Sequence, residues 1–68
     1  MSANKAMKEA RLGAGLSQQQ LADRVGVSRQ TIHAIEKGDY NPTIVLCIGI
    51  CRVLGLTLND LFWEETEK

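Results

Sequence analysis

The chain has 68 residues, of which 44% are hydrophobic and only 4% aromatic, and its eight basic side chains balance its eight acidic ones. This length supports one small, mainly aliphatic core and leaves no room for a second domain. The most apolar run ends at Arg52, well short of the ~18 residues of a membrane span, and early lysines interrupt any signal-peptide pattern. We therefore expect a single domain over residues 1–68, cytoplasmic and without a membrane partner.

Glycines divide the sequence into amphipathic segments. Four of them follow such a segment, where a helix commonly ends on a left-handed residue: Gly15, Gly26, Gly38 and Gly55. The sequence predicts helices over residues 4–13, 18–25, 29–37, 44–54 and 58–64. Hydroxyl residues that can accept from an unpaired backbone N–H precede the last four: Ser17, Ser28, Thr43 and Thr57. The expected fold is all-α, a compact five-helix bundle.

The apolar positions of these segments define the expected core. Its members are Met7, Ala10, Leu16, Leu21, Ala22, Val25, Val27, Ile32, Ile35, Ile44, Cys47, Ile50, Cys51, Leu54, Leu58, Leu61 and Phe62. The two cysteines stand one helical turn apart, where a disulfide has poor geometry. A structural zinc site needs about four ligands, and the chain has one histidine. We expect small core residues here, with no metal and no cofactor.

The stretch from Ser17 to Glu36, SQQQLADRVGVSRQTIHAIE, predicts two short helices with a glycine turn between them. Apolar residues repeat at helical spacing on each side of Gly26, and the turn is too tight for an antiparallel hairpin. The outward face of the second helix carries side chains able to reach base edges and phosphates: Arg29, Gln30, His33 and Lys37. A helix-turn-helix that reads DNA, over about residues 17–36, is the leading interpretation. The alternative is an ordinary solvated polar face.

Charge is distributed unevenly although its sum is zero. Residues 1–43 hold six basic side chains against four acidic ones, whereas residues 44–68 hold two against four. This asymmetry can orient the first part of the chain toward phosphates. It predicts low nonspecific affinity compared with strongly basic DNA-binding proteins.

Taken in order, four pieces of the sequence resemble the phage-repressor/Cro-type (XRE-like) helix-turn-helix family in its small single-domain form. They are Arg11 with the following GLSQ (15–18), LADRVGVSRQTIHAIEKG (21–38), NPT (41–43) and LGLTLNDLFW (54–63). The chain departs from the family at Val45 and Gly49, where relatives often have charged residues. The resemblance implies a DNA-binding regulator, and the sequence has no Ser/His/Asp set, phosphate-binding glycine loop or carboxylate cluster that would indicate an enzyme.

The resemblance also implies roles for individual residues. Base edges would be read from the start of the second helix by Ser28, Arg29, Gln30 and His33. Phosphates would be held by Gln18, Lys37, Tyr40 and Asn41. Tyr40 has an equally good alternative place at the edge of the core. In relatives, the arginine and glutamate that match Arg11 and Glu36 form a partly buried salt bridge between the first and third helices.

The implied function is that of a sequence-specific regulator of transcription, a repressor that binds double-stranded DNA at a palindromic operator as a homodimer. Symmetric pairing places two recognition helices in successive major grooves, ~34–36 Å apart. The expected interface is the C-terminal segment 57–68 with Phe62 and Trp63, next to surplus apolar residues of the fourth helix: Val45, Ile48 and Val53.

Two alternatives remain open at this point. Trp63 can fold back on its own core, with dimers forming only on DNA. The chain can also be a protein-interaction module, antitoxin-like or an anti-repressor partner, that keeps the fold without binding DNA. The polar residues of the two helices favour the DNA-binding regulator. No small-molecule ligand is evident in the sequence.

Overall fold

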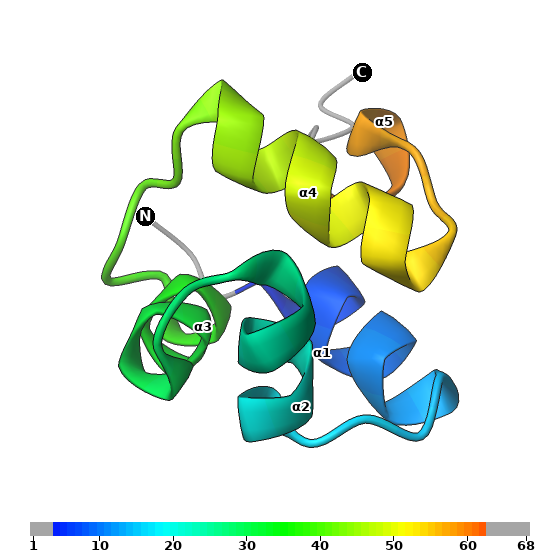
Figure 1. Cartoon of the computed structure of the whole chain (residues 1–68). Coiled ribbons are helices and arrows are strands. Elements are labelled where there is room, and N and C mark those ends of the chain that lie inside the picture. Colours follow the sequence, from blue (N-terminus) through cyan, green and yellow to red (C-terminus); the bar gives the residue numbers. More distant parts are fainter. Residues whose placement is uncertain (1–3, 63–68) are drawn as a thin grey trace.

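The computed structural model describes residues 4–62, which form five α-helices and no strand. The helices are α1 (Lys5–Gly13), α2 (Gln18–Val25), α3 (Arg29–Lys37), α4 (Ile44–Leu54) and α5 (Leu58–Leu61) (Figure 1). The all-α prediction is confirmed, and the predicted bounds of the first four helices agree to within one residue. Phe62 is the C-cap of α5, and the last two residues predicted for that helix lie outside the described range.

Side-chain caps explain where the helices begin. Ser17 and Gln20 form the capping box of α2: the Ser17 hydroxyl accepts from the Gln20 N–H at 3.0 Å, and the Gln20 side chain accepts from the Ser17 N–H at 2.8 Å. The predicted hydroxyl caps of the next three helices are also present: Ser28, Thr43 and Thr57. The turn between α2 and α3 requires a left-handed residue, and Gly26 occupies it with φ of 91°.

The helices pack so that α2 contacts both α3 and α4, while α1 contacts α3 and α5. Figure 1 shows α2 and α3 side by side, with α4 lying across the top of the bundle in that view. The buried apolar residues come from all five helices and the loop before α2: Met7, Leu16, Leu21, Ala22, Ile32, Ile35, Cys47, Ile50, Cys51 and Leu61. Within residues 4–62, no helix has the length and apolar character to cross a bilayer.

The prediction was wrong for one residue of the expected core. Ile44 is 61% exposed, whereas Leu46, which the prediction omitted, packs against the core. Ile44 has the helical phase of Cys47 and Cys51, but it stands in the first turn of α4, where its side chain is left exposed. Helical phase alone does not show how far neighbouring elements extend.

Candidate nucleic-acid interface

Helix α3 has a buried side and an exposed side. The residues on its buried side are Ile32, Ile35 and Glu36. Its long exposed polar side chains are Arg29, Gln30, His33 and Lys37. At about 100° per residue, these four positions occupy a single sector about 100° wide around the helix. The structure therefore brings three of the predicted base-reading side chains, and one predicted for phosphate, to the same surface.

Ser28, the fourth residue predicted to read bases, is committed to capping α3. Its hydroxyl accepts from the Thr31 backbone N–H at 3.2 Å and lies 3.0 Å from the Thr31 hydroxyl. The residue is exposed at the start of α3. Its cap gives the backbone at Arg29 and Gln30 a defined direction, because it satisfies an otherwise unpaired N–H of the first turn.

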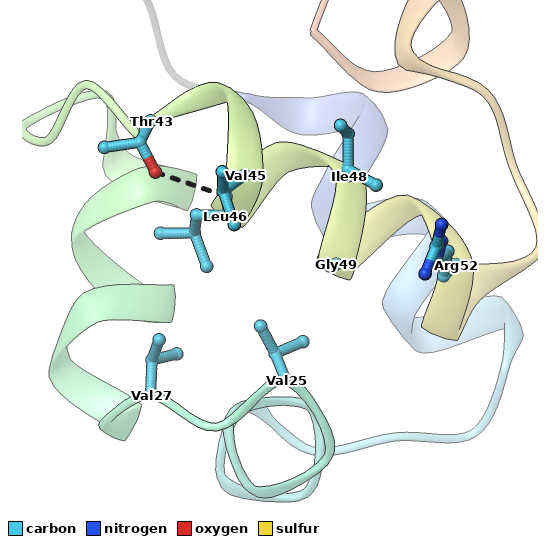
Figure 2. A pocket seen from close by; sticks show the side chains of 8 residues that line it. All are labelled: Val25, Val27, Thr43, Val45, Leu46, Ile48, Gly49 and Arg52. Atoms are coloured by element: carbon cyan, nitrogen blue, oxygen red, sulfur yellow. Dashed lines mark hydrogen bonds between the residues drawn. The ribbon is translucent and has the colours of Figure 1, made fainter.

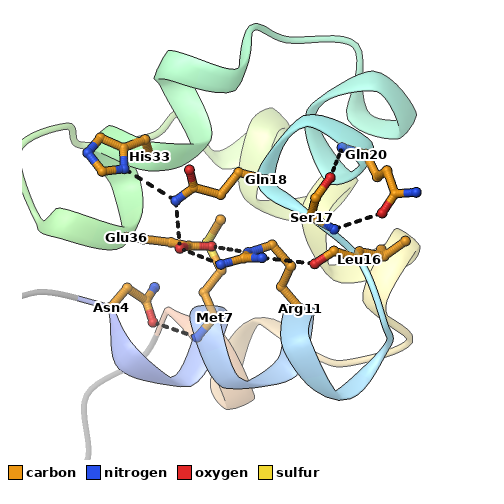
Figure 3. A network of polar contacts seen from close by, with 9 residues as sticks. All are labelled: Asn4, Met7, Arg11, Leu16, Ser17, Gln18, Gln20, His33 and Glu36. Carbon is orange, nitrogen blue, oxygen red and sulfur yellow. Dashed lines mark hydrogen bonds and ion pairs between the residues drawn. The ribbon is translucent and has the colours of Figure 1, made fainter.

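The Arg11–Glu36 ion pair holds α3 from the inside. Arg11 Nε donates to Glu36 Oε2 at 2.7 Å, and Arg11 Nη2 donates to Glu36 Oε1 at 3.2 Å (Figure 3). The two side chains are only 7% and 5% exposed, so the pair is more buried than the resemblance implies. Arg11 Nη1 also donates to the Leu16 carbonyl at 2.8 Å, which attaches the loop before α2 to the same guanidinium. A bidentate, further hydrogen-bonded pair of this kind fixes relative orientation as well as distance.

Gln18 is also attached to this pair, which the sequence did not indicate. Its side-chain Nε2 donates to Glu36 Oε1 at 3.1 Å and lies 3.3 Å from His33 Nδ1 (Figure 3). The side chain predicted to hold a phosphate therefore has its nitrogen directed at two residues of α3. The first backbone N–H groups of α2 still lack intrahelical partners, and a helix N-terminus of this kind suits an anion.

The loop between α3 and α4 carries the remaining residues predicted to contact phosphate. Tyr40 is 41% exposed, so its ring lies at the surface, and Asn41 is exposed beside it. Lys37 Nζ lies 3.4 Å from Asp39 Oδ2, and both side chains are more than half exposed. An exposed pair of this kind contributes little stability, so Lys37 can leave it at small cost.

An apolar groove of about 530 Å³ lies between the α2–α3 turn and α4 (Figure 2). Its lining residues are Val25, Val27, Thr43, Val45, Leu46, Ile48, Gly49 and Arg52. The prediction that Val45 and Ile48 lie outside the core is confirmed, because they are 75% and 38% exposed. Val53, predicted to lie with them, instead packs against the core. Phe62 also packs partly against the core, and Trp63 lies outside the described residues.

Cys47 and Cys51 are buried, as the sequence predicts for small core residues. Burial raises the pKa of both thiols, because the thiolate would lose its hydration. Among residues 4–62, no group of three or more histidine, cysteine or acidic side chains is arranged to hold a metal ion. The burial of both side chains assigns the two thiols to the core packing of α4.

Comparison with known proteins supports the interpretation of α2 and α3 as a helix-turn-helix. The helix-turn-helix family pattern matches residues 7–61. A Bacillus subtilis (strain 168) protein named as the uncharacterized HTH-type transcriptional regulator YgzD is 48% identical over 62 residues, covering 91% of this chain and 94% of that protein. The immunity repressor of Bacillus phage phi105 is 30% identical over 66 residues, which are 97% of this chain but only 46% of the repressor.

Among solved structures, the restriction-modification controller protein C.AhdI from Aeromonas hydrophila is similar with a TM-score of 0.80 and 29% identity. The match covers 85% of this chain and 88% of that protein. The similarity of the whole fold and the family match over residues 7–61 point to the same family. This chain therefore belongs to the helix-turn-helix family of the phage-repressor/Cro (XRE) type, whose members are DNA-binding regulators of transcription and not enzymes.

Proposed function

We propose that this protein is a sequence-specific repressor that binds double-stranded DNA as a homodimer and reads the major groove with α3. The observation that carries the proposal is the grouping of Arg29, Gln30 and His33 on one exposed side of α3. The opposite side of the same helix is fixed by the core and by the Arg11–Glu36 pair. A rigid helix with long polar side chains near its start is the arrangement that enters a major groove in this motif.

The side chains suit different parts of DNA. Arg29 can donate two hydrogen bonds to guanine O6 and N7, and Gln30 can pair with adenine N6 and N7. The N-terminus of α2, Lys37 and the loop residues Tyr40 and Asn41 would hold phosphates and set the register of α3. Base contacts would then provide specificity, while phosphate contacts would provide much of the affinity.

The homodimer follows from the small footprint of one recognition helix. A two-fold pair would place two such helices ~34–36 Å apart on a palindromic operator. The segment 57–68, with Phe62 and Trp63, is the proposed interface, and the exposed Val45 and Ile48 of α4 offer further apolar surface. The repressor role is supported by the similarity to a phage immunity repressor.

Selection of bound duplexes from a random pool, followed by affinity measurements on variants, tests DNA reading. Arg29→Ala and Gln30→Ala should each weaken binding to the selected duplex by about 1–3 kcal/mol, with little change on random duplex. Arg24→Ala is the matched control, because it removes an exposed positive charge from α2 and none from the outer side of α3. Absence of any salt-sensitive duplex binding would favour a protein-interaction module instead.

Sedimentation of the free protein at micromolar concentration tests the dimer. Trp63→Ala should shift the protein toward monomer, whereas Val45→Ser tests whether α4 contributes to the interface. A monomer in the wild type that is unchanged by Trp63→Ala would contradict the C-terminal interface. Expression from a reporter placed behind the selected duplex then distinguishes repression from activation.

A further inference from the structure

The side-chain amide of Gln18 lies between two residues of the recognition helix. Its Nε2 is 3.1 Å from Glu36 Oε1 and 3.3 Å from His33 Nδ1. Glu36 in turn is held by the buried guanidinium of Arg11 at 2.7 Å. A continuous set of contacts therefore runs from the interior, through Gln18, to an exposed side chain on the DNA-reading side of α3 (Figure 3).

The Glu36 carboxylate determines which way the Gln18 amide points. A carboxylate paired with arginine has only acceptor oxygens, so its neighbour must be the NH₂ group of the amide. A reversed amide would place the Gln18 oxygen against Glu36 Oε1, leaving two acceptors in contact. Because the Glu36 side chain is only 5% exposed, water has little access to relieve that repulsion.

The amide then determines the state of the histidine ring. The Gln18 nitrogen carries two hydrogens and cannot accept a hydrogen bond, so His33 Nδ1 must be the acceptor in their 3.3 Å contact. In a neutral imidazole, the proton must then be on Nε2. Figure 3 shows this second ring nitrogen on the side of the ring away from Gln18.

We propose that Gln18 is a positioning residue that fixes His33 as the Nε2–H tautomer, so that α3 presents a hydrogen-bond donor to DNA at this position. The proposal rests on the proposed function, because it assumes that the outer side of α3 faces DNA. A donor selects acceptors, namely purine N7, guanine O6, thymine O4 or a phosphate oxygen. It disfavours the amino groups of adenine and cytosine in the major groove.

The tautomer can be measured in the free protein. His33 is the only histidine, so a ¹⁵N-labelled full-length chain gives a single pair of ring-nitrogen signals. At about pH 8.5, where an ordinary imidazole is neutral, the signals should show a protonated Nε2 and an unprotonated Nδ1. Gln18→Glu replaces the donor with a carboxylate that Glu36 repels, so the contact with Nδ1 is lost and the share of the Nε2–H tautomer should fall.

Two further variants complete the experiment. Gln18→Met removes the amide and should move the tautomer ratio away from the wild-type value. Gln19→Met is the matched control on the same helix, since the Gln19 amide donates to Asp23 at 2.8 Å and should leave the His33 signals unchanged. A tautomer ratio that is the same in the wild type, Gln18→Glu and Gln18→Met would overturn the proposal.

The acceptor on DNA is tested with the duplex selected from the random pool. Single replacements of purines by 7-deaza analogues, of guanine by 2-aminopurine and of thymine by 5-methyl-2-pyrimidinone remove the base acceptors N7, O6 and O4 in turn, and single methylphosphonates probe phosphates. One such replacement should weaken wild-type binding by about tenfold and have no further effect on His33→Ala. If no replacement depends on His33, the donor role on DNA fails while the tautomer result stands. If the pool yields no bound duplex, the proposed function itself fails.

Discussion

Asn4 and Leu61 are separated by 57 positions, and Asn4 Nδ2 donates a 2.8 Å hydrogen bond to the Leu61 carbonyl oxygen. The Asn4 Oδ1 accepts from the Met7 N–H at 3.0 Å and so caps α1. The Asn4 backbone N–H donates to the Glu36 carbonyl at 3.0 Å. One residue at the start of α1 therefore joins the last turns of α3 and α5.

Replacing Asn4 separates the contribution of the α1 cap from that of the hydrogen bond to Leu61. Asn4→Ser keeps a capping hydroxyl but cannot reach Leu61, and it should lower the free energy of unfolding by about 1 kcal/mol. Asn4→Ala loses the cap as well and should cost about 1–3 kcal/mol in total. Urea denaturation of the two variants measures both values. Equal stabilities for Asn4→Ser and the wild type would show that the bond to Leu61 contributes nothing.

Removing one member of the Arg11–Glu36 pair leaves a buried charge without its partner. Arg11→Ala and Glu36→Ala should each lower the free energy of unfolding by about 3–5 kcal/mol, and the double variant should lose less than the sum. Glu36→Gln keeps an acceptor for Arg11 and serves as the milder variant if the others do not fold. Denaturation midpoints equal to that of the wild type for both single variants would contradict a stabilising pair.

Gly49, inside α4, and Gly55, its C-cap, form a matched pair for testing how an added Cβ changes the free energy of unfolding. A Cβ at Gly49 would meet only Val25 Cγ1, at 3.5 Å, which is ordinary van der Waals contact. Gly49→Ala should therefore raise the free energy of unfolding by about 1 kcal/mol through helix propensity. Gly55 has φ of 71°, so Gly55→Ala should lower it by about 1–2 kcal/mol. Thermal melting of both variants gives the signs, and a destabilised Gly49→Ala would contradict the conclusion that a methyl group fits beside Val25.

The two cysteine thiols should react slowly in the folded protein, and they should make its stability fall at alkaline pH. Burial raises the pKa of Cys47 and Cys51, so the folded protein retains their protons at a pH where the unfolded chain loses them. Their contribution to stability is therefore complete below the usual thiol pKa and is lost as the pH rises through the raised value. Alkylation at pH 8 should be slower for folded than for urea-unfolded protein, because the thiolate is the reacting form.

A double Cys47→Ala/Cys51→Ala variant is the control for this dependence. It should lose the alkaline decrease in stability while keeping its affinity for DNA. Metal analysis of the purified wild type checks the core interpretation separately. Stoichiometric metal, or equal alkylation rates for folded and unfolded protein, would contradict the assignment of the two thiols to the core.

The features that depend on neighbouring residues could be predicted from the sequence. Helix bounds followed from glycines and capping residues, because their hydrogen bonds close over three or four positions, as between Ser17 and Gln20. The exposed side of α3 followed from its 3.6-residue period. The joint order of the helix-turn-helix segments led to the correct family.

The contacts that depend on tertiary placement could not be predicted in the same way. Nothing local to Gln18 indicates that its amide reaches Glu36 and His33, since α2 must first lie against α3. Ile44 has the phase of a core residue, but no neighbouring element covers it and it is 61% exposed. Asn4 did carry a usable signal, because asparagine is a favoured N-cap and stands three residues before Met7.

The contacts of Gln18 divide the outer residues of α3 into two kinds. In the described contacts, the Arg29 and Gln30 side chains have no bond to the interior, whereas His33 is linked to it through Gln18 and Glu36. If α3 reads bases as proposed, exchange of the first two residues, one at a time, can therefore change the target sequence without disturbing the scaffold. A change at position 33 also removes one hydrogen-bond partner of the Gln18 amide. Redesign of target specificity would thus be simplest at the first turn of the helix and would need a compensating change at Gln18 further along it.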